Sequence, residues 1–585
     1  MSASAQPAAN VPVRRAVIIG LVAVLAIAIG VAAGGFLLTN RAAAIGAGAA
    51  YVPADAPFYF EMRLDPSTAQ DGALRELLGR FPAIEGVDLD QPLYAQMAER
   101  LDEMLAAEGT GVSWANDVAP WFDGHLALGV IEVPLVALAV PADPMAVPEV
   151  PPVVLLLGVT DAAVAGEAID RLLSAGGEAT STFTESEYAG STILTAEGTA
   201  GGSYSLTEDQ VVIGSDADAV KAALDARASG SGTLAEVAEM TRLTDTLPTD
   251  WLAFMTYDMT DLMAQSLSGA EEQDPAVSAA LQSLMEHQPL RGAMAFSAGG
   301  DRLVLDAATD APTGPFAVEN ADRGLASEVP SDVLFYSDAG NIGSALTGVM
   351  DAIRGAVAAT PEASEQLDMV EAALGADLSE VVSWIDDGAF VAGHDGSQPY
   401  AGIILVPNDV DAASRRLGQL GSFATAATLD PSSGLSVEEA DVDGVTITTI
   451  RWEDSATGND AVVLGLTEVV VEYAVTDNRA LIGVGDGFIR RVLALDEADS
   501  LASQPRFVDA VAELGGADNA GVAWLDITAA RGALEGAFGP MMTMMDPEGL
   551  YASEVQPWLL PLDRLVSVSR LEGDVLVQRG ALIVE

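Results

Sequence analysis

The longest uninterrupted apolar stretch of the chain lies near its beginning. No charged residue occurs from Ala16 to Thr39, and as a helix this segment would extend about 36 Å, enough to cross the hydrocarbon core of a bilayer. Arg14 and Arg15 precede it, and the chain turns acidic beyond Arg41, so the positive-inside rule places residues 1–15 in the cytoplasm. We therefore expect a transmembrane helix over 16–39 with everything after it outside the membrane.

A cleaved signal peptide is the alternative, because the small residues of RAAAIGAGAA after the apolar stretch offer cleavage sites. The apolar core of such a peptide is normally only about 7 to 15 residues long, which favours an uncleaved anchor. No second membrane span is expected, because acidic residues and prolines interrupt the next apolar run, from Leu126 to Val159. That run predicts two strands, HLALGVIEV and PVVLLLGVT, with a proline-rich loop between them.

After the anchor, short apolar runs alternate with segments of helical spacing. YSLTEDQVVIG, from Tyr204, has two apolar-rich arms around an acidic turn and predicts a β-hairpin. Ser215 or Asp216 can cap a helix that follows it, with Val220, Ala223 and Leu224 on one face. Hairpins followed by helices favour an α+β fold, in which an antiparallel sheet carries packed helices.

The pattern occurs twice. YSLTEDQVVIGSDADAVKAAL from Tyr204 matches YAVTDNRALIGVGDGFIRRVL from Tyr473 without a gap. Further matches follow in the same order along the chain: YVPADAPFYFEMRLD with EVPSDVLFYSDAG, NDVAPWFDG with SEVVSWIDDG, LLLGVTDAAVAGEAIDRL with IILVPNDVDAASRRLGQL, YAGSTILT with VDGVTITT, AFMTYDMTDL with GVAWLDITAA, and GGDRLVLDAA with EGDVLVQRGA. An internal repeat of this length predicts two tandem units, residues 51–311 and 328–585, joined by a linker over 312–327.

Composition narrows the classes of partner. The chain has 26 basic and 86 acidic residues and a formal net charge of −60. Such a surface repels nucleic acid, whose binding requires clustered cations, so we expect neither nucleic acid nor nucleotide partners. Solubility, adaptation to high salt and cation binding all remain readings of this acidity. The absence of cysteine excludes disulfides, thiolate nucleophiles and cysteine zinc sites.

The segment LIGVGDGFIRRVLAL resembles a phosphate-binding loop at first sight. Its glycines, Gly483, Gly485 and Gly487, give G-x-G-x-G rather than G-x-G-x-x-G, and the matching positions of the other unit are Gly214, Asp216 and Asp218, which would place carboxylates where a phosphate would sit. We therefore interpret the segment as a turn followed by a helix.

Other candidate chemistry lacks a specific motif. The three histidines, His125, His287 and His394, fall in no short ligand spacing, and the single lysine, Lys221, belongs to no phosphate-binding or serine-lysine motif. A pair of carboxylates could form a glycosidase site, but with 86 acidic residues nothing selects one. We accordingly predict no catalytic residue and no cofactor-binding residue, and the metal-binding residues remain unknown.

Two apolar features have both a structural and a binding interpretation. Trp121 and Trp384 occupy matching positions in the two units, which favours anchoring of each core over ligand stacking. The methionines of MMTMMD, from Met541, could line an adaptable binding surface or form a buried helix face.

The opening of the first unit resembles a bacterial family known as domain of unknown function 3352. The resemblance rests on Val52-Pro53 and Asp55, on Leu64-Asp65-Pro66, and on several further positions: Gln70, Leu74, Leu77, Leu78, Phe81, Pro82, Trp121 and Gly124. It implies a membrane-anchored envelope protein of unassigned activity, so no catalytic residue can be carried over.

Together these features predict a single-pass protein whose bulk lies outside the cell membrane and which binds or scaffolds in the cell envelope. Its expected partners are the lipid bilayer, through the N-terminal helix, and an envelope protein or glycan. Two alternatives stay open: a carrier of apolar ligands, and an envelope hydrolase that uses a carboxylate pair.

Overall fold

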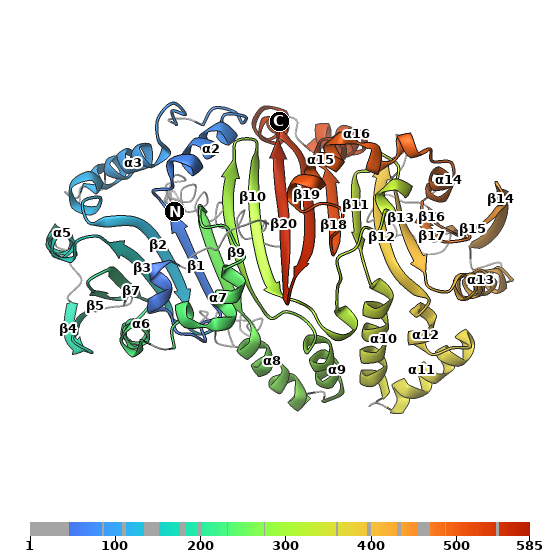
Figure 1. Cartoon of the computed structure of the whole chain (residues 1–585), viewed down its shortest axis with the longest axis horizontal. Helices are drawn as coiled ribbons and strands as arrows, with labels where there is room; N and C mark the ends of the chain where they lie inside the picture. Colours follow the sequence, from blue (N-terminus) through green and yellow to red (C-terminus); the bar gives the residue numbers. More distant parts are fainter. Residues whose placement is uncertain are drawn as a thin grey trace, which may run out of the picture.

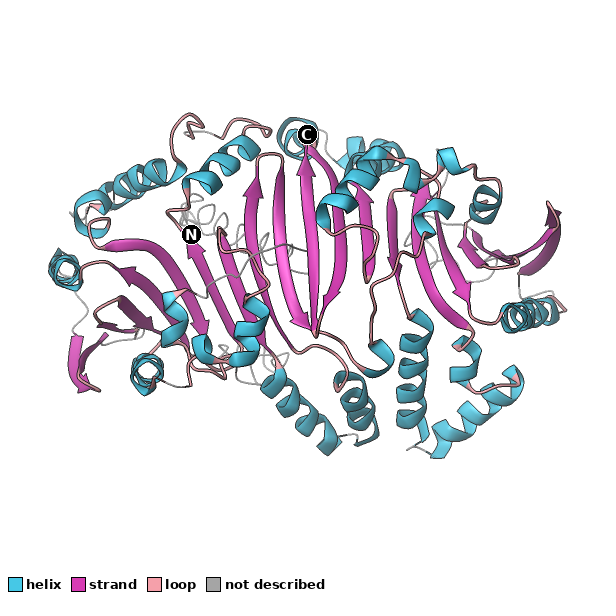
Figure 2. Cartoon of the chain, viewed as in Figure 1, coloured by secondary structure: helices cyan, strands magenta, loops and turns pink. Residues whose placement is uncertain are grey.

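The protein is a mixed α+β structure built on one long antiparallel sheet (Figures 1 and 2). The computed structural model describes residues 46–84, 87–107, 113–133, 151–175, 183–196, 202–230, 232–273, 275–358, 361–394, 399–429, 434–453, 468–485, 487–545 and 549–585. All twenty strands in these ranges belong to the same sheet, and helices lie along both of its faces and at its ends. The predicted fold class is confirmed at this level.

Ten strands come from the first half of the chain. Their order across the sheet is β4-β5-β6-β7-β3-β2-β1-β8-β9-β10. Their bounds are β1 Phe58–Arg63, β2 Phe122–Val130, β3 Val153–Val159, β4 Phe183–Tyr188, β5 Ser191–Ala196, β6 Ser203–Leu206, β7 Gln210–Gly214, β8 Ala253–Asp258, β9 Arg291–Gly299 and β10 Arg302–Asp310.

The second half repeats this order as β14-β15-β16-β17-β13-β12-β11-β18-β19-β20. Its strands are β11 Phe335–Ala339, β12 Ile385–His394, β13 Pro399–Pro407, β14 Leu435–Val442, β15 Val445–Glu453, β16 Glu468–Val475, β17 Ala480–Val484, β18 Gly521–Asp526, β19 Leu562–Glu572 and β20 Val575–Val584. β10 and β20 pair along nine residues and join the halves into one sheet (Figure 1).

The register follows the internal sequence match as well. Leu155 of β3 lies opposite Ile213 of β7, and their counterparts in the second half, Ile403 and Ile482, lie opposite each other in the same way. Because a slip of one residue would turn every side chain to the other face of a sheet, the two halves place matching residues on matching faces.

Helices bury apolar side chains on both faces of the sheet. On one face, α6 (Ala217–Ser229) and α7 (Ala238–Thr244) share a core with β1, β3 and β9, and α14 (Phe488–Leu493) and α15 (Pro505–Leu514) do so in the second half. On the opposite face, α5 (Ala162–Ala175) covers β3 and β7, and α13 (Val410–Ala427) covers β13 and β17. The remaining long helices are α2 Thr68–Leu78, α3 Leu93–Ala107, α8 Thr260–Gln273, α9 Pro275–Met285, α10 Ile342–Ala358, α11 Pro361–Leu374 and α16 Ile527–Met545, with short α12 Leu378–Val382 and α17 Gln556–Leu559.

Several local predictions are confirmed. β6 and β7 form the expected hairpin, and Asp216 caps α6 by accepting hydrogen bonds from the amides of Asp218 and Ala219 at 2.9 and 2.8 Å. β2 and β3 are the two predicted strands and pair with each other. Trp121 and Trp384 are 3% and 5% exposed and anchor matching apolar clusters.

Other predictions fall outside what the structure describes. The predicted transmembrane helix, 16–39, precedes the first described residue, and no helix within the described ranges is long and apolar enough to span a bilayer. The side chains of Met541 to Met545, at the end of α16, are likewise not described.

Candidate functional site

A cavity lies in the first half of the chain, between α5, α6 and the turns of two hairpins. Its volume is about 710 Å³. α5 contributes Gly166, Ile169 and Asp170, α6 contributes Leu224 and Arg227, and the hairpins contribute the rest of the wall: Ser191, Thr192, Leu194, Tyr204, Leu206, Thr207, Glu208 and Asp209. We refer to this space as the α5–α6 cavity.

A hydrogen-bonded corner forms one side of the cavity. The Tyr51 hydroxyl lies 2.7 Å from Thr207 Oγ1 and donates a short hydrogen bond to Asp209. Arg227 is ion-paired with Asp209 at 3.2 Å and lies over the Tyr51 ring, 5.4 Å from its centroid. Burial and the hydrogen bond to Asp209 raise the pKa of Tyr51 to about 12, so the phenol stays protonated and donates at neutral pH.

A second tyrosine in the wall has an unsatisfied hydroxyl. Tyr204 Oη is shielded from solvent and has no hydrogen-bond partner among the described residues. Burial, together with the charges of Asp170 and Glu185, raises the pKa of Tyr204 to about 12. A buried polar atom without a partner is uncommon and costs free energy. Because this hydroxyl is shielded from solvent, it lies beneath the wall of the cavity and not on its surface.

The matching tyrosine of the second half packs against a helix. Tyr473, the counterpart of Tyr204, belongs to the apolar cluster beneath α13 and its hydroxyl lies close to Gly421 of that helix. The counterpart of Tyr51 is Glu328, which Arg479 holds through Nε at 3.0 and 2.9 Å. In both halves, therefore, a polar contact links the first residue of the repeat to the turn of a hairpin. The packing beside this contact differs between the halves.

The segment LIGVGDGFIRRVLAL leads from β17 into α14, as the sequence predicts. Gly485 and Gly487 have φ of +90° and +89°, conformations that favour glycine, and Gly487 is the residue from which α14 begins. The Gly487 amide donates to Glu472 Oε2 at 3.3 Å. A carboxylate of the protein itself thus lies at the position where a phosphate would be bound.

The histidines and the lysine have local partners. His125 Nδ1 lies 2.7 Å from Glu61 Oε1, and His287 Nδ1 lies 3.1 Å from Thr313 Oγ1. Lys221 pairs with Asp218 at 2.7 Å. Within the described residues no cluster of His, Cys, Asp or Glu could hold a metal ion, and the structure does not bring the predicted candidates together into one site.

Buried tyrosine–acid pairs were missed by the sequence reasoning. Tyr59 donates to Glu61 at 2.7 Å, and the matching Tyr336 donates to Asp338 at 2.6 Å. Burial raises the pKa of Asp338. The signal that could have found them is an acid two residues after a tyrosine in both copies of the FY strand, since an acidic residue on the buried face of a strand needs a partner.

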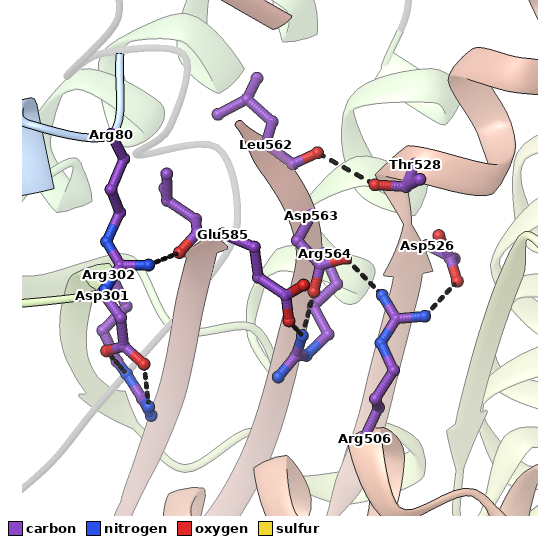
Figure 3. A network of polar contacts seen from close by, with 11 residues as sticks. Arg80, Asp301, Arg302, Arg506, Asp526, Thr528, Leu562, Asp563, Arg564 and Glu585 are labelled. Atoms are coloured by element: carbon purple, nitrogen blue, oxygen red, sulfur yellow. Dashed lines mark hydrogen bonds and ion pairs between the residues drawn. The ribbon is translucent and has the colours of Figure 1, made fainter. Parts of the chain in front are cut away.

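Arginine contacts gather near the C-terminal end of the sheet, and the contact of Arg80 joins the first half to the second (Figure 3). Arg80 donates to the carbonyl oxygen of Val584 at 2.9 Å, and Arg564 pairs with Glu585 at 3.2 Å. Arg506 of α15 bridges Asp526, at 3.1 Å, and Asp563. These contacts hold strand ends and involve none of the residues of the α5–α6 cavity.

Comparison with known proteins identifies the family. A family model described as "Protein of unknown function (DUF3352)" matches residues 16–559. The chain belongs to this family. No curated protein matches this DUF3352 chain at a significant level. One solved structure, "Structure of crystal form I of TP0453", matches at 10% identity over 46% of this chain and 94% of that chain, with a TM-score of 0.18; a score this low supports no inference about this DUF3352 protein.

Proposed function

We propose that this DUF3352 protein is a membrane-anchored binding protein of the cell envelope, and that the α5–α6 cavity is its ligand site. In this proposal residues 16–39 form the anchor, residues 1–15 lie in the cytoplasm, and two repeated units, 51–311 and 328–585, lie outside. In the second unit Tyr473 packs against α13 at the matching position, and this unit supports the sheet.

The difference between the two halves is the observation that carries the proposal. A duplicated unit starts with the same packing in both copies, and Tyr473 with α13 represents the filled version. Where Tyr204 stands, the space is an open cavity of about 710 Å³, within the range of pockets that bind small molecules. An unfilled space costs packing energy, which favours a role for it in binding.

Cysteine labelling tests the location and the site together, because the chain has no cysteine of its own. Ser2→Cys reports on the N-terminus, Ser191→Cys on the cavity wall, and Val445→Cys on the matching position of the second half. In intact cells or spheroplasts, a membrane-impermeant maleimide should label the last two variants but not Ser2→Cys.

Protection by a native ligand gives the second readout. Ser191→Cys should react more slowly in cells than after purification and extensive washing, whereas Val445→Cys should react at the same rate in both states. Labelling of Ser2→Cys in cells would contradict the proposed orientation. Equal rates for Ser191→Cys before and after washing would contradict a ligand in the cavity.

The apolar-carrier alternative has one supporting observation. Phe390, Trp452, Val469 and Val484 are 39% to 49% exposed, and strand register places them on one face of the sheet. If this face carried an acyl chain, a fluorescent fatty acid would bind the full-length chain and Trp452→Gln would release it. The cavity proposal predicts that Trp452→Gln leaves ligand binding unchanged.

A further inference from the structure

Another cavity lies in the second half, between α15 and the segment 321–327 that precedes the second repeat. Its volume is about 320 Å³, at the lower end of the range of small-molecule pockets. The apolar part of its wall comes from α15 and β18: Phe507, Val508, Val511, Ala512 and Val522. We refer to this space as the α15 cavity.

The apolar side chains of this wall keep surface that a ligand can reach. Val508 is 44% exposed, and Ala512, one turn further along α15, is exposed as well. Phe507, Val511 and Val522 are 6% to 8% exposed and line the same space. An apolar ligand in the cavity would remove this surface from water, which is favourable.

The buried polar side chains of the lining are already bonded within the protein. Arg323 donates to the carbonyl oxygens of Asn519, at 2.9 Å, and Glu319, at 3.1 Å, and its Nε lies 3.6 Å from Asp387 Oδ2. Asn519 Nδ2 donates to the carbonyl oxygen of Gly516 at 2.8 Å. These groups therefore gain little from a polar ligand.

The acids and the hydroxyl of the lining have partners as well. Asp338 accepts from the Tyr336 hydroxyl at 2.6 Å. Asp322 accepts from the Gly324 amide at 3.2 Å, and the Ser327 hydroxyl donates to the Gly324 carbonyl oxygen at 2.6 Å. A charged group of either sign would lose its water in this space without gaining a new partner, so the lining favours an uncharged, apolar ligand.

The matching helix of the first half has a polar surface. The two halves can be matched here because each has the same isolated β-bridge before the helix, Pro53–Thr233 and Pro330–Ser500. Counted from these bridges, three positions of the α15 wall correspond to polar residues: Val508 to Thr241, Val511 to Thr244 and Ala512 to Asp245. The apolar wall thus occurs in the half that has this cavity, which supports a role in binding.

We propose that the α15 cavity binds an uncharged apolar molecule, held by contact of its hydrocarbon with Val508, Val511 and Ala512. This site is separate from the α5–α6 cavity and does not depend on the ligand proposed there. The recognised chemistry is an uncharged hydrocarbon group, which a neutral lipid or a free small molecule can supply.

Cysteine protection in the full-length chain, held in lipid nanodiscs, tests the inference. Ala512→Cys places a thiol in the cavity wall, and Asp509→Cys places one at an exposed position of α15 outside the lining. The soluble probes are octan-1-ol, octanoate and octylammonium, which share one alkyl chain and differ in charge. Dioctanoylglycerol in the bilayer is the neutral lipid, and monobromobimane labels the thiols.

The expected result is protection of the cavity thiol by the uncharged probe. Octan-1-ol at about ten times its dissociation constant should slow labelling of Ala512→Cys about tenfold, because only the unoccupied protein reacts, and should leave Asp509→Cys unchanged. Octanoate and octylammonium should bind at least about tenfold more weakly. Protection by dioctanoylglycerol as well would identify a lipid chain as the source, and protection by octan-1-ol alone a free molecule; both agree with the inference.

A charge added to the wall should abolish the protection. Val508→Asp changes an exposed position of α15, and Ala512→Cys should stay reactive beside it with octan-1-ol present. Leu534→Asp on α16 is the matched control, since Leu534 is 58% exposed and lies outside the lining; it should keep the full protection. The melting temperature of each variant shows that it is folded.

Three outcomes overturn the inference. Failure of both octan-1-ol and dioctanoylglycerol to protect Ala512→Cys at concentrations up to about millimolar excludes an apolar ligand. Equal protection by octanoate or octylammonium refutes the preference for an uncharged one. Protection that persists in Val508→Asp, or that occurs equally at Asp509→Cys, places the effect outside the cavity.

Discussion

Asp306 and Arg579 lie directly opposite each other on β10 and β20, the two strands that join the halves of the sheet. They are also matching positions of the internal repeat, in GGDRLVLDAA and EGDVLVQRGA. Residues that match each other and also pair with each other lie on the local two-fold axis of the molecule. The centre of the sheet is thus a buried acid facing a buried base, 1% and 7% exposed.

This central pair lacks full hydrogen bonding. Asp306 Oδ1 and Arg579 Nε and Nη2 are buried without a partner among the described residues. Burial raises the pKa of Asp306 to about 8, and the attraction of Arg579 offsets only part of that shift. Burial likewise lowers the pKa of Arg579 to about 10. Asp306 is therefore mainly protonated in the folded protein at neutral pH.

Asp306→Asn should remove a pH dependence of stability. An acid whose pKa rises from about 4 in the unfolded chain to about 8 in the fold stabilises the fold below pH 4, and this contribution is lost as the pH rises through 8. The wild-type protein and Asp306→Asn should therefore have similar melting temperatures at pH 4. By pH 8 the wild type should be less stable by up to about 5 kcal/mol.

Scanning calorimetry between pH 4 and 9 measures the difference. Asp509→Asn, at an exposed position of α15, is the matched control and should retain the wild-type slope. Parallel curves for the wild type and Asp306→Asn would show that Asp306 is ionised in the fold like an exposed acid.

Tyr59→Phe and Tyr336→Phe should destabilise their two halves alike. Each removes the hydroxyl that donates to a buried acid two residues later, at 2.7 and 2.6 Å, and an unsatisfied buried acceptor costs about 1 to 3 kcal/mol. Tyr188→Phe, which loses an exposed hydrogen bond to Asp225, should leave stability nearly unchanged. Denaturant unfolding would compare the three variants, and equal effects at the buried and exposed sites would refute the role of the pairs.

Glu61→Gln should lower the pKa of His125. The hydrogen bond to Glu61 raises that pKa above the ordinary value, so the stability contributed by protonated His125 is present below about pH 6.5 and lost as the pH rises through the folded pKa. Because the side chain is 35% exposed, the contribution should stay under about 1 kcal/mol. Proton NMR titration of the His125 imidazole in the wild type and in Glu61→Gln measures the shift directly, and equal pKa values in the two proteins would contradict the role of Glu61.

Gly402→Ala should destabilise the second half. A Cβ at Gly402 would lie 2.1 Å from the ring of Phe488, which packs against β13 and β17 from α14, and overpacking of this kind costs about 1 to 3 kcal/mol. Phe488→Leu in the same chain should recover part of the loss. Gly418→Ala, in open space on α13, should instead gain up to about 1 kcal/mol from helix propensity; the same sign of change at both glycines in thermal unfolding would disprove the packing argument.

The local elements of this fold could be predicted from sequence because they depend on near neighbours. The β6–β7 hairpin, the Asp216 cap and the buried face of α6 follow from alternation, turn residues and capping chemistry. Strand order and register were not predicted, although the matching pairs Leu155 with Ile213 and Ile403 with Ile482 adopt the same register in the structure.

The pairing that joins the two halves, and the α5–α6 cavity, could not be predicted from local sequence. The pairing of β10 with β20 brings together residues about 270 positions apart in the chain, and no local pattern specifies which strands meet. The cavity depends on how closely α5 and α13 approach their strands, although Tyr204 and Tyr473 are the same residue type in matching segments. The same residue type at matching positions can therefore pack against a helix glycine in one copy and line a cavity in the other.

Fluorine NMR of the full-length chain, labelled with 3-fluorotyrosine and held in nanodiscs, tests the ligand site most directly. Tyr204→Phe and Tyr473→Phe assign the two matching resonances among the ten tyrosines of the chain. Removal of the native ligand by extensive washing should shift the Tyr204 resonance and leave that of Tyr473 in place. An unmoved Tyr204 resonance after washing, or equal shifts of both, would contradict a ligand site in the first half.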